Sequence, residues 1–241
     1  MKTHIAVSSI AALALLAVPC VSQAATIIQP NTPTSNVAAD AGSTNAGLVN
    51  GIGLSASVTT GTDTATALAA THANGTLSQA YVTNDPGAVD GDYYAQGGAP
   101  PVFTFTLGGT FNDVESILVW NYSQTAGGGV PSRNGARTFD LQFFSDAAAT
   151  TQVGATISGL TLAQSLTTPQ IAQQVFFGAG VNFDGVQSAR MTVTDNYFGM
   201  GGGAGGDRVG LAEVRFSQVP EPSAALLGGL GALALLRRRR A

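Results

Sequence analysis

Alternation of apolar and polar residues is the feature that most restricts the fold of this chain. Residues 102–107 read Val-Phe-Thr-Phe-Thr-Leu, which places Phe103, Phe105 and Leu107 on one face. A period of two predicts a half-buried β-strand. Residues 137–144 repeat the pattern with Phe139, Leu141 and Phe143. Both segments therefore predict strands that turn one apolar face toward a core.

Other segments of similar character predict further strands, at residues 114–121, 152–157, 171–177, 189–195 and 209–217. Turn signals such as Asn134-Gly135 and Asp184-Gly185 separate them. Only residues 65–70 predict helix, of one or two turns, and Trp120 lies inside a predicted strand as a core residue. Short strands at this spacing predict an all-β fold, an antiparallel β-sandwich or barrel.

The last predicted strand changes phase. Val209 and Leu211 share one face by alternation, whereas Val214 and Phe216 share the other. One extra residue in the strand, a β-bulge near Ala212 and Glu213, reconciles the two pairs. Such a bulge also turns Glu213 toward a neighbouring loop.

The N-terminal segment has the composition of a secretory signal peptide. Lys2 precedes an apolar stretch at residues 5–18, and Ser22-Gln23-Ala24 supplies small residues. Charge, a short apolar stretch and a small-residue site are the three parts of such a signal. We predict cleavage after Ala24, with Ala25 as the alternative.

The C-terminal segment has three parts as well. Pro220, Glu221 and Pro222 precede an apolar run at residues 223–236, and Arg237, Arg238, Arg239 and Arg240 follow it. Fourteen residues of helix span only about 21 Å, less than the ~30 Å of a bilayer core. The arginines favour the cytoplasmic side. This short hydrophobic helix therefore predicts transient retention in the inner membrane.

This tail resembles the PEP-CTERM sorting signal of Gram-negative bacteria that make exopolysaccharide. The resemblance implies that exosortase, a membrane transpeptidase, recognises Pro220-Glu221-Pro222 and cuts near it. It also implies a location at the cell surface or in the extracellular matrix. The chain then divides into a signal peptide at residues 1–24, an exported domain at 25–218 and a sorting signal at 219–241.

The composition of the exported domain excludes several chemistries. Outside the two terminal segments the chain has thirteen acidic residues, five arginines, no lysine and no cysteine. Cysteine nucleophiles, disulfides and thiolate metal sites are excluded, as are Schiff-base catalysis and a P-loop. Excess negative charge makes nucleic acid an unsuitable partner. His72, the one histidine there, is expected at the surface.

The exported domain resembles galactose-binding-like domains of the discoidin type, which are jelly-roll sandwiches. Four segments carry the resemblance, residues 47–54, 114–122, 133–144 and 209–216. It implies a structural calcium ion held by Asn50, nearby carbonyl groups and Glu213, with Asp40 as a further ligand. The alternative is that Glu213 pairs with an arginine such as Arg215 or Arg190. Asp90 and Asp92 also suit calcium, although such pairs are more often solvated turn residues.

Aromatic residues in loops suggest a carbohydrate ligand. Tyr93, Tyr94, Tyr197 and Phe198 fall in predicted loops, where discoidin-type domains bind ligands. We expect them to form a stacking platform for sugar rings, the alternative being partial burial at the end of the sandwich. Asp113 and Glu115 share a predicted strand face and form a candidate pair for glycoside hydrolysis.

These features favour an exported, non-catalytic protein of the cell surface or matrix that binds exopolysaccharide. Two alternatives remain open. One is a hydrolase that acts on that polysaccharide, and the other is a structural matrix protein without a specific ligand.

Overall fold

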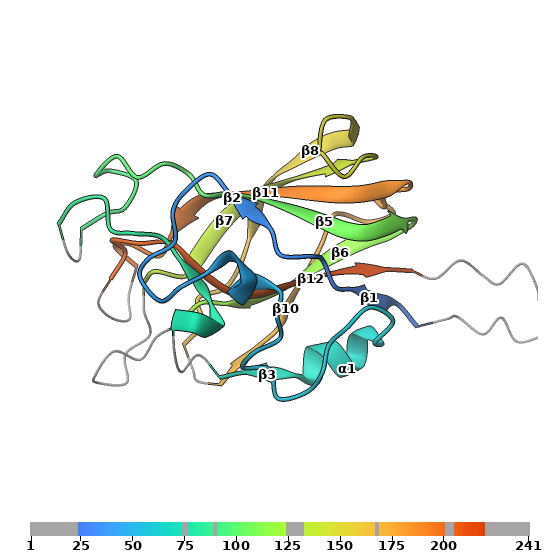
Figure 1. Cartoon of the computed structure of the whole chain (residues 1–241), viewed down its shortest axis with the longest axis horizontal. Helices are drawn as coiled ribbons and strands as arrows, with labels where there is room; N and C mark the ends of the chain where they lie inside the picture. The colour runs from blue at the N-terminus through green and yellow to red at the C-terminus, as the bar shows by residue number, and fades with distance from the viewer. Residues whose placement is uncertain are drawn as a thin grey trace, which may run out of the picture.

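Two antiparallel sheets lie face to face in the computed structural model (Figure 1), which describes residues 24–73, 77–88, 91–123, 133–166, 169–200 and 205–219. Sheet A has the order β1 (Thr26–Ile28), β12 (Gly210–Gln218), β6 (Val114–Asn121) and β10 (Gln173–Phe176), and β4 (Tyr81–Val82) also pairs with β12. Sheet B has the order β2 (Thr34–Ser35), β5 (Val102–Phe111), β11 (Val186–Asn196), β7 (Ala136–Phe144) and β8 (Gln152–Thr161). The predicted antiparallel β-sandwich is confirmed.

The alternating residues form the core between the sheets. Phe103 and Phe105 of β5 are fully buried and lie in the same cluster as Phe143 of β7 and Phe216 of β12. The intervening threonines of β5 are partly exposed. Rings pack edge-on or tilted, for example Phe105 and Phe216 with centroids 5.8 Å apart. The period of two therefore specified which side chains enter this cluster, the central core.

The expected bulge is present in β12. Leu211 pairs with Asn121, whereas Glu213 pairs with Trp120, so that one residue, Ala212, is left over. Val209, Leu211, Val214 and Phe216 all reach the central core as a result. Glu213 turns to the opposite face of sheet A, where it meets the loop at Gly51.

Two predicted segments differ from the structure. Residues 171–177 form two short strands rather than one. β9 (Gln170–Ile171) pairs with β3 (Thr71–His72), and β10 pairs with β6. The turn of the chain at Ala172 buries this small residue against a second cluster. The strand predicted at 152–157 extends to Thr161 as the edge strand β8.

Residues 49–73 and 77–80 cover the outer face of sheet A (Figure 1). This covering layer contains α1 (Thr64–Ala69), β3 and η2 (Leu77–Gln79), and η1 (Asn45–Leu48) precedes it. Asp63 caps α1 by accepting a hydrogen bond from the N–H of Thr66 at 2.8 Å. Trp120 is fully buried here and donates to the Ala70 carbonyl at 2.8 Å, which confirms its core role.

His72 lies in this layer as well and is completely buried. The expected surface position is therefore wrong. A Cβ atom at Gly53 would come within 2.9 Å of the imidazole, so the close approach of the two segments requires glycine there. The histidine is covered because β3 packs beneath the loop at residues 51–54, a contact that alternation does not reveal.

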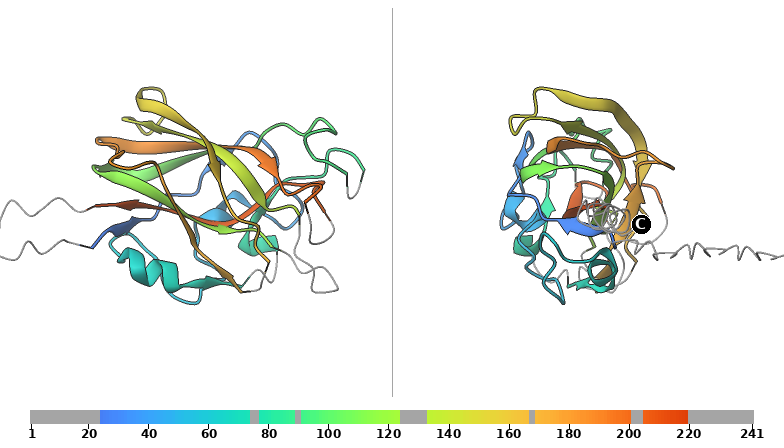
Figure 2. Two further views of the ribbon diagram at one scale, coloured as in Figure 1. Left: turned by 180° about the vertical axis from the view of Figure 1, so that it is seen from behind. Right: turned by 90° about the vertical axis from the view of Figure 1, so that its right-hand side faces the viewer.

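The two ends of the domain lie side by side. Thr26 at the start of β1 pairs with Gln218 at the end of β12. We call this end of the sandwich the exit end; Figure 2 shows that residues 84–88 and 91–100 lie at the other end. Among the described residues, no helix is long and apolar enough to cross a membrane. The predicted hydrophobic segment at 223–236 lies outside those residues.

Candidate functional site

The loop end, opposite the exit end, is formed by residues 91–100, 195–200 and 205–208. A buried amide organises it. Asn196, the last residue of β11, donates to the carbonyls of Gly206 at 2.8 Å and Arg208 at 2.9 Å. The Tyr93 N–H also donates to the Gly206 carbonyl at 2.8 Å. These bonds fix the loops on the rigid end of sheet B.

Tyr93 and Tyr94 are packing residues in this arrangement. Tyr93 is 2% exposed, and its hydroxyl donates to the Ala99 carbonyl at 2.9 Å. The Tyr94 hydroxyl donates to the Val193 carbonyl at 3.0 Å. The two rings meet edge to face, and burial raises the pKa of both phenols. Rings held in this way do not offer a free face to a sugar, so the expected platform is wrong for this pair.

Tyr197 and Phe198 differ from each other. Tyr197 is 8% exposed and donates to the Leu162 carbonyl, so its ring is also occupied by packing. Phe198 is 38% exposed, and its N–H donates to the Asn196 side chain at 3.0 Å. Of the four aromatic residues expected to form the platform, Phe198 presents its ring to solvent most clearly.

A charged pair lies close to Phe198 in the chain. Arg137 of β7 and Asp195 of β11 form an ion pair of 2.8 Å, with side chains 38% and 40% exposed. A guanidinium supplies several donors and a carboxylate supplies acceptors, which suits the vicinal hydroxyls of a sugar. The exposed ring, the ion pair and Met200, which is also exposed, are the surface features available for binding at this end.

A hollow of about 650 Å³ lies beside the loop end, a size typical of small-molecule sites. It is lined by Thr32, Ser35, Asn36, Val37, Ala38, Ala39, Thr44, Asn45 and Ala46. Asn36 donates to the Pro100 carbonyl at 3.2 Å, and Asp40 pairs with Arg208 at 3.6 Å. Sequence reasoning missed this hollow because its lining is a mixture of small polar and apolar residues, and only the fold gives it a shape.

The expected calcium ligands do not fit a metal site in this geometry. Glu213 is completely buried, and its carboxylate accepts from Arg215 through Oε1 and from the Gly51 N–H through Oε2 at 3.1 Å. The Asn50 carbonyl oxygen accepts from the Ile52 N–H at 2.8 Å. Asp40 is paired elsewhere, as described above. The alternative expectation, a pair between Glu213 and Arg215, is the one that the structure shows.

The electrostatics of this pair follow from burial. Loss of hydration raises the pKa of Glu213 to about 7, although Arg215 and the Gly51 N–H oppose the rise. Burial likewise lowers the pKa of Arg215. In the described part of the chain, no group of three or more histidine, cysteine, aspartate or glutamate residues is arranged to hold a metal ion.

The remaining carboxylates are scattered. Asp113 precedes β6 and accepts from Asn182, whereas Glu115 lies on β6 near the exit end. Partial burial raises the pKa of Glu115. Asp92 accepts from the Tyr94 N–H at 3.0 Å, as a turn residue does, and Asp90 lies outside the described residues.

The sorting residues Pro220, Glu221 and Pro222 and the arginines 237–240 also lie outside the described residues. Of the two expected cleavage positions, Ala24 is exposed. Ala25 is tied to the domain, since its carbonyl accepts from the N–H and the hydroxyl of Thr64, both at 2.9 Å.

Several solved structures resemble the fold. The family 32 CBM from C. perfringens NanJ in complex with galactose is 11% identical, with a TM-score of 0.43 over 80% of this chain and 99% of that one. The lectin binding domain of a Lectinolysin mutant complexed with Lewis b is 16% identical, with a TM-score of 0.44 over 80% and 96%. CBM32-3 from a family 31 glycoside hydrolase from Clostridium perfringens is 15% identical, with a TM-score of 0.42 over 79% and 91%.

The C-terminal segment gives a sequence match. No curated protein matches the chain. Residues 218–240, however, match the family model of the PEP-CTERM protein-sorting motif, as the three-part composition of the tail predicted. The tail of this chain is therefore a PEP-CTERM sorting motif, the mark of an exported, surface-associated protein.

Proposed function

We propose that this chain is an exosortase-processed protein of the Gram-negative cell surface or extracellular matrix, and that its loop end binds exopolysaccharide without cleaving it. The observation that carries the proposal is that the chain ends lie at one end of the sandwich and the loops lie at the other. Thr26 pairs with Gln218, so the described ends of the domain, from which the predicted signal peptide and the sorting tail continue, lie together at the exit end. The loop end then points away from the membrane while the chain is held in it.

The chemistry of the loop end supports a sugar ligand. The Phe198 ring offers an apolar face for stacking, and Arg137 and Asp195 offer donors and acceptors for hydroxyl groups. Among the surfaces described, this one combines an exposed ring with an ordered polar pair on the frame of sheet B. Such a combination of apolar and polar groups is typical of small-ligand recognition.

Binding of the full chain, in mild detergent, to exopolysaccharide recovered from the culture medium tests the proposal. We expect Phe198→Ala to weaken binding about tenfold, equivalent to ~1.4 kcal/mol. Phe176→Ala is the matched control, because Phe176 is 56% exposed but lies on β10 at the exit end. Equal binding by wild type and Phe198→Ala would remove the loop end as the site, and no binding by wild type would favour a purely structural role.

A hydrolase is the second candidate, favoured by one observation. Glu115, with its raised pKa, lines a pocket of about 220 Å³ at the exit end. Incubation of the chain with the same polysaccharide distinguishes the two functions. Release of reducing ends that is lost in Glu115→Gln supports hydrolysis, whereas binding without release supports the proposed function.

The contacts of Ala25 support cleavage of the signal peptide after Ala24. A cut at that position leaves Ala25 in place, with both hydrogen bonds to Thr64 intact. A cut after Ala25 removes them. N-terminal sequencing of the exported protein is expected to give Ala25 as the first residue, and Thr26 as the first residue would contradict this expectation.

A further inference from the structure

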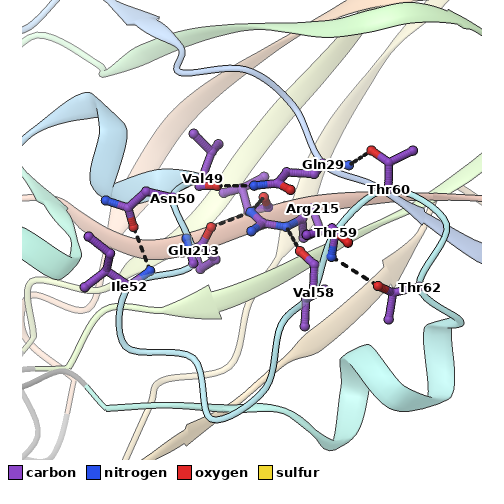
Figure 3. A network of polar contacts seen from close by, with 12 residues as sticks. Gln29, Val49, Asn50, Ile52, Val58, Thr59, Thr60, Thr62, Glu213 and Arg215 are labelled. Carbon is purple, nitrogen blue, oxygen red and sulfur yellow. Dashed lines mark hydrogen bonds and ion pairs between the residues drawn. The ribbon is translucent and has the colours of Figure 1, made fainter.

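A long-range polar connection joins the last strand to the covering layer (Figure 3). The Arg215 side chain is 1% exposed. Its Nε donates to the Val58 carbonyl at 2.9 Å, and its Nη1 donates to the Val214 carbonyl at 2.8 Å and pairs with Glu213. Glu213 in turn accepts from the Gly51 N–H at 3.1 Å. Through these bonds β12 holds the loop at residues 51–58 against sheet A.

The donor atoms around Arg215 are those that a hard metal ion prefers. Carboxylate and backbone carbonyl oxygens converge there, and calcium takes six to eight such ligands. In this chain a guanidinium already lies among them and donates to three oxygen-bearing groups, those of Val58, Val214 and Glu213. The planar fork of arginine suits this convergence, because it supplies up to five N–H donors in a fixed geometry.

We propose that the Arg215 guanidinium occupies the cation position between the last strand and the covering layer, so that the chain holds this layer in place without a metal ion. The sequence resemblance implied calcium at Glu213, and the disagreement between that implication and the geometry is the basis of the proposal. An internal cation cannot be removed by a chelator or lost by dilution.

The charge balance supports this assignment. Among the described residues Glu213 is the one carboxylate paired with Arg215, so the pair is neutral when Glu213 is ionised and positive when Glu213 is protonated. The adjacent pocket of about 200 Å³ is lined by Gln29, Asn50, Gly51, Leu54, Ala56, Ser57, Val58, Thr59 and Arg215, a lining without a second carboxylate. A divalent ion bound here in addition to Arg215 would face a net positive excess in a buried region, which is strongly unfavourable.

Neighbouring bonds complete the connection without charge. The Gln29 side chain donates to the Val49 carbonyl at 2.9 Å, and the Thr59 N–H donates to the Thr62 hydroxyl at 3.1 Å (Figure 3). These bonds fix the chain on both sides of the loop at residues 51–58. Within the loop itself, Glu213 holds Gly51 and Arg215 holds Val58.

The first test measures how the melting temperature of the full chain, in mild detergent, depends on metal ions. Trp120, the single tryptophan, lies on β6 and packs against the covering layer, so its fluorescence reports detachment of this layer. We expect the melting temperature to change by less than about 1 °C between excess EDTA and excess CaCl₂, and elemental analysis after dialysis to find no bound calcium. A melting temperature that falls in EDTA and recovers with calcium, or one calcium per chain, would overturn the proposal.

The second test removes the internal cation. Arg215→Ser leaves the oxygen atoms of Glu213, Val58 and Val214 around a vacated position, and we expect its melting temperature to fall on the order of 10 °C. We also expect calcium to raise the melting temperature of this variant by several degrees, which wild type does not show. Arg190→Ser is the control, because Arg190 lies on sheet B over the Phe144 ring, and calcium should not change its melting.

A folded Arg215→Ser variant that ignores calcium would contradict the assignment of a cation position. If that variant does not fold, Glu213→Gln combined with Arg215→Met removes both charges together. We expect this double variant to melt higher than either single variant, since no unpaired charge remains buried. Equal or lower melting of the double variant would overturn the pairing on which the proposal rests.

Discussion

The two faces of sheet A are packed in different ways. The face toward sheet B meets the central core, where Phe143 contacts Phe177, Phe183 and Phe216. The other face meets the covering layer, which is rich in alanine; sheet A itself contributes the rings of Trp120 and Tyr122 and the buried pair of Glu213 and Arg215 to this contact. The central core is stabilised by apolar burial, whereas the covering layer also depends on directional polar bonds.

This difference shows how one strand serves two layers. In β6, Ile117 and Val119 point to the central core, and Leu118 and Trp120 point to the covering layer. Apolar side chains pack in many arrangements, but the polar bonds of the covering layer require specific partners. The covering layer is therefore expected to be the more sensitive of the two to pH and to loss of single hydrogen bonds.

The largest effect is expected in the central core. Phe143→Ala removes a ring whose centroid lies 4.6 Å from that of Phe183 and 5.1 Å from that of Phe177. The resulting cavity should lower the free energy of unfolding by about 3–5 kcal/mol in urea denaturation. Phe176→Ala, on the exposed surface, should change it by less than about 0.5 kcal/mol. Similar losses for the two variants would break the distinction between core and surface rings.

A pH titration sharpens the comparison of the two layers. The pKa of Glu213 is raised to about 7 from the ordinary 4.5, so between these values the folded chain keeps a proton that the unfolded chain has released. Stability from this group is therefore complete below about pH 4.5 and is lost as the pH rises through 7, by on the order of 3 kcal/mol. Urea denaturation at a series of pH values measures the slope.

Glu213→Gln should flatten this slope, because the variant has no proton to release at that position. Glu115 also has a raised pKa through partial burial, so Glu115→Gln is the control that leaves the Glu213 contribution in place. A wild-type slope of the opposite sign between pH 5 and 7 would contradict the assignment of burial as the dominant cause.

A smaller loss of unfolding free energy is expected from substitution of Trp120, which faces the covering layer. Trp120→Phe keeps most of the apolar surface but leaves the Ala70 carbonyl without its 2.8 Å bond. The unpaired buried acceptor should cost about 1–2 kcal/mol of unfolding free energy, measured by circular dichroism in urea. No measurable loss would show that this polar bond contributes little to holding the layer.

The smallest effect is expected from the exposed ion pair. Arg137 and Asp195 lie 2.8 Å apart but are more than a third exposed, in contrast to the buried pair of Arg215 and Glu213. Arg137→Gln should lower the free energy of unfolding by less than about 0.5 kcal/mol, and added salt should reduce the difference further. A loss as large as that of Arg215→Ser would show that burial does not separate the two pairs.

The strands could be predicted from local pattern because burial of one face imposes a period of two. The prediction for residues 114–121 coincides with β6, and the bulge in β12 followed from a phase change in four apolar residues. Residues 171–177 were harder, because a turn at Ala172 sends two short strands to different sheets. No local alternation records which sheet a short strand joins.

The candidate site was predicted only in part. Phe198 lies in a loop and its ring is exposed, as expected. Tyr93 and Tyr197 also lie at loop positions in the sequence, but both are buried, and their hydroxyls donate to the carbonyls of Ala99 and Leu162. The hollow beside β2 has no sequence signal, since its lining consists of small residues brought together by pairing with β5.

The sequence by itself determined the β class, the faces of the long strands and the sorting tail, because each depends on residues that are neighbours in the chain. Tertiary structure alone decided that residues 49–73 and 77–80 cover sheet A, that Glu213 meets Gly51 and Arg215 meets Val58, and that Thr26 lies beside Gln218. The reason is physical: these contacts join distant segments, as Gly51 and Glu213 do across 162 residues, and their geometry exists only after the sheets have formed.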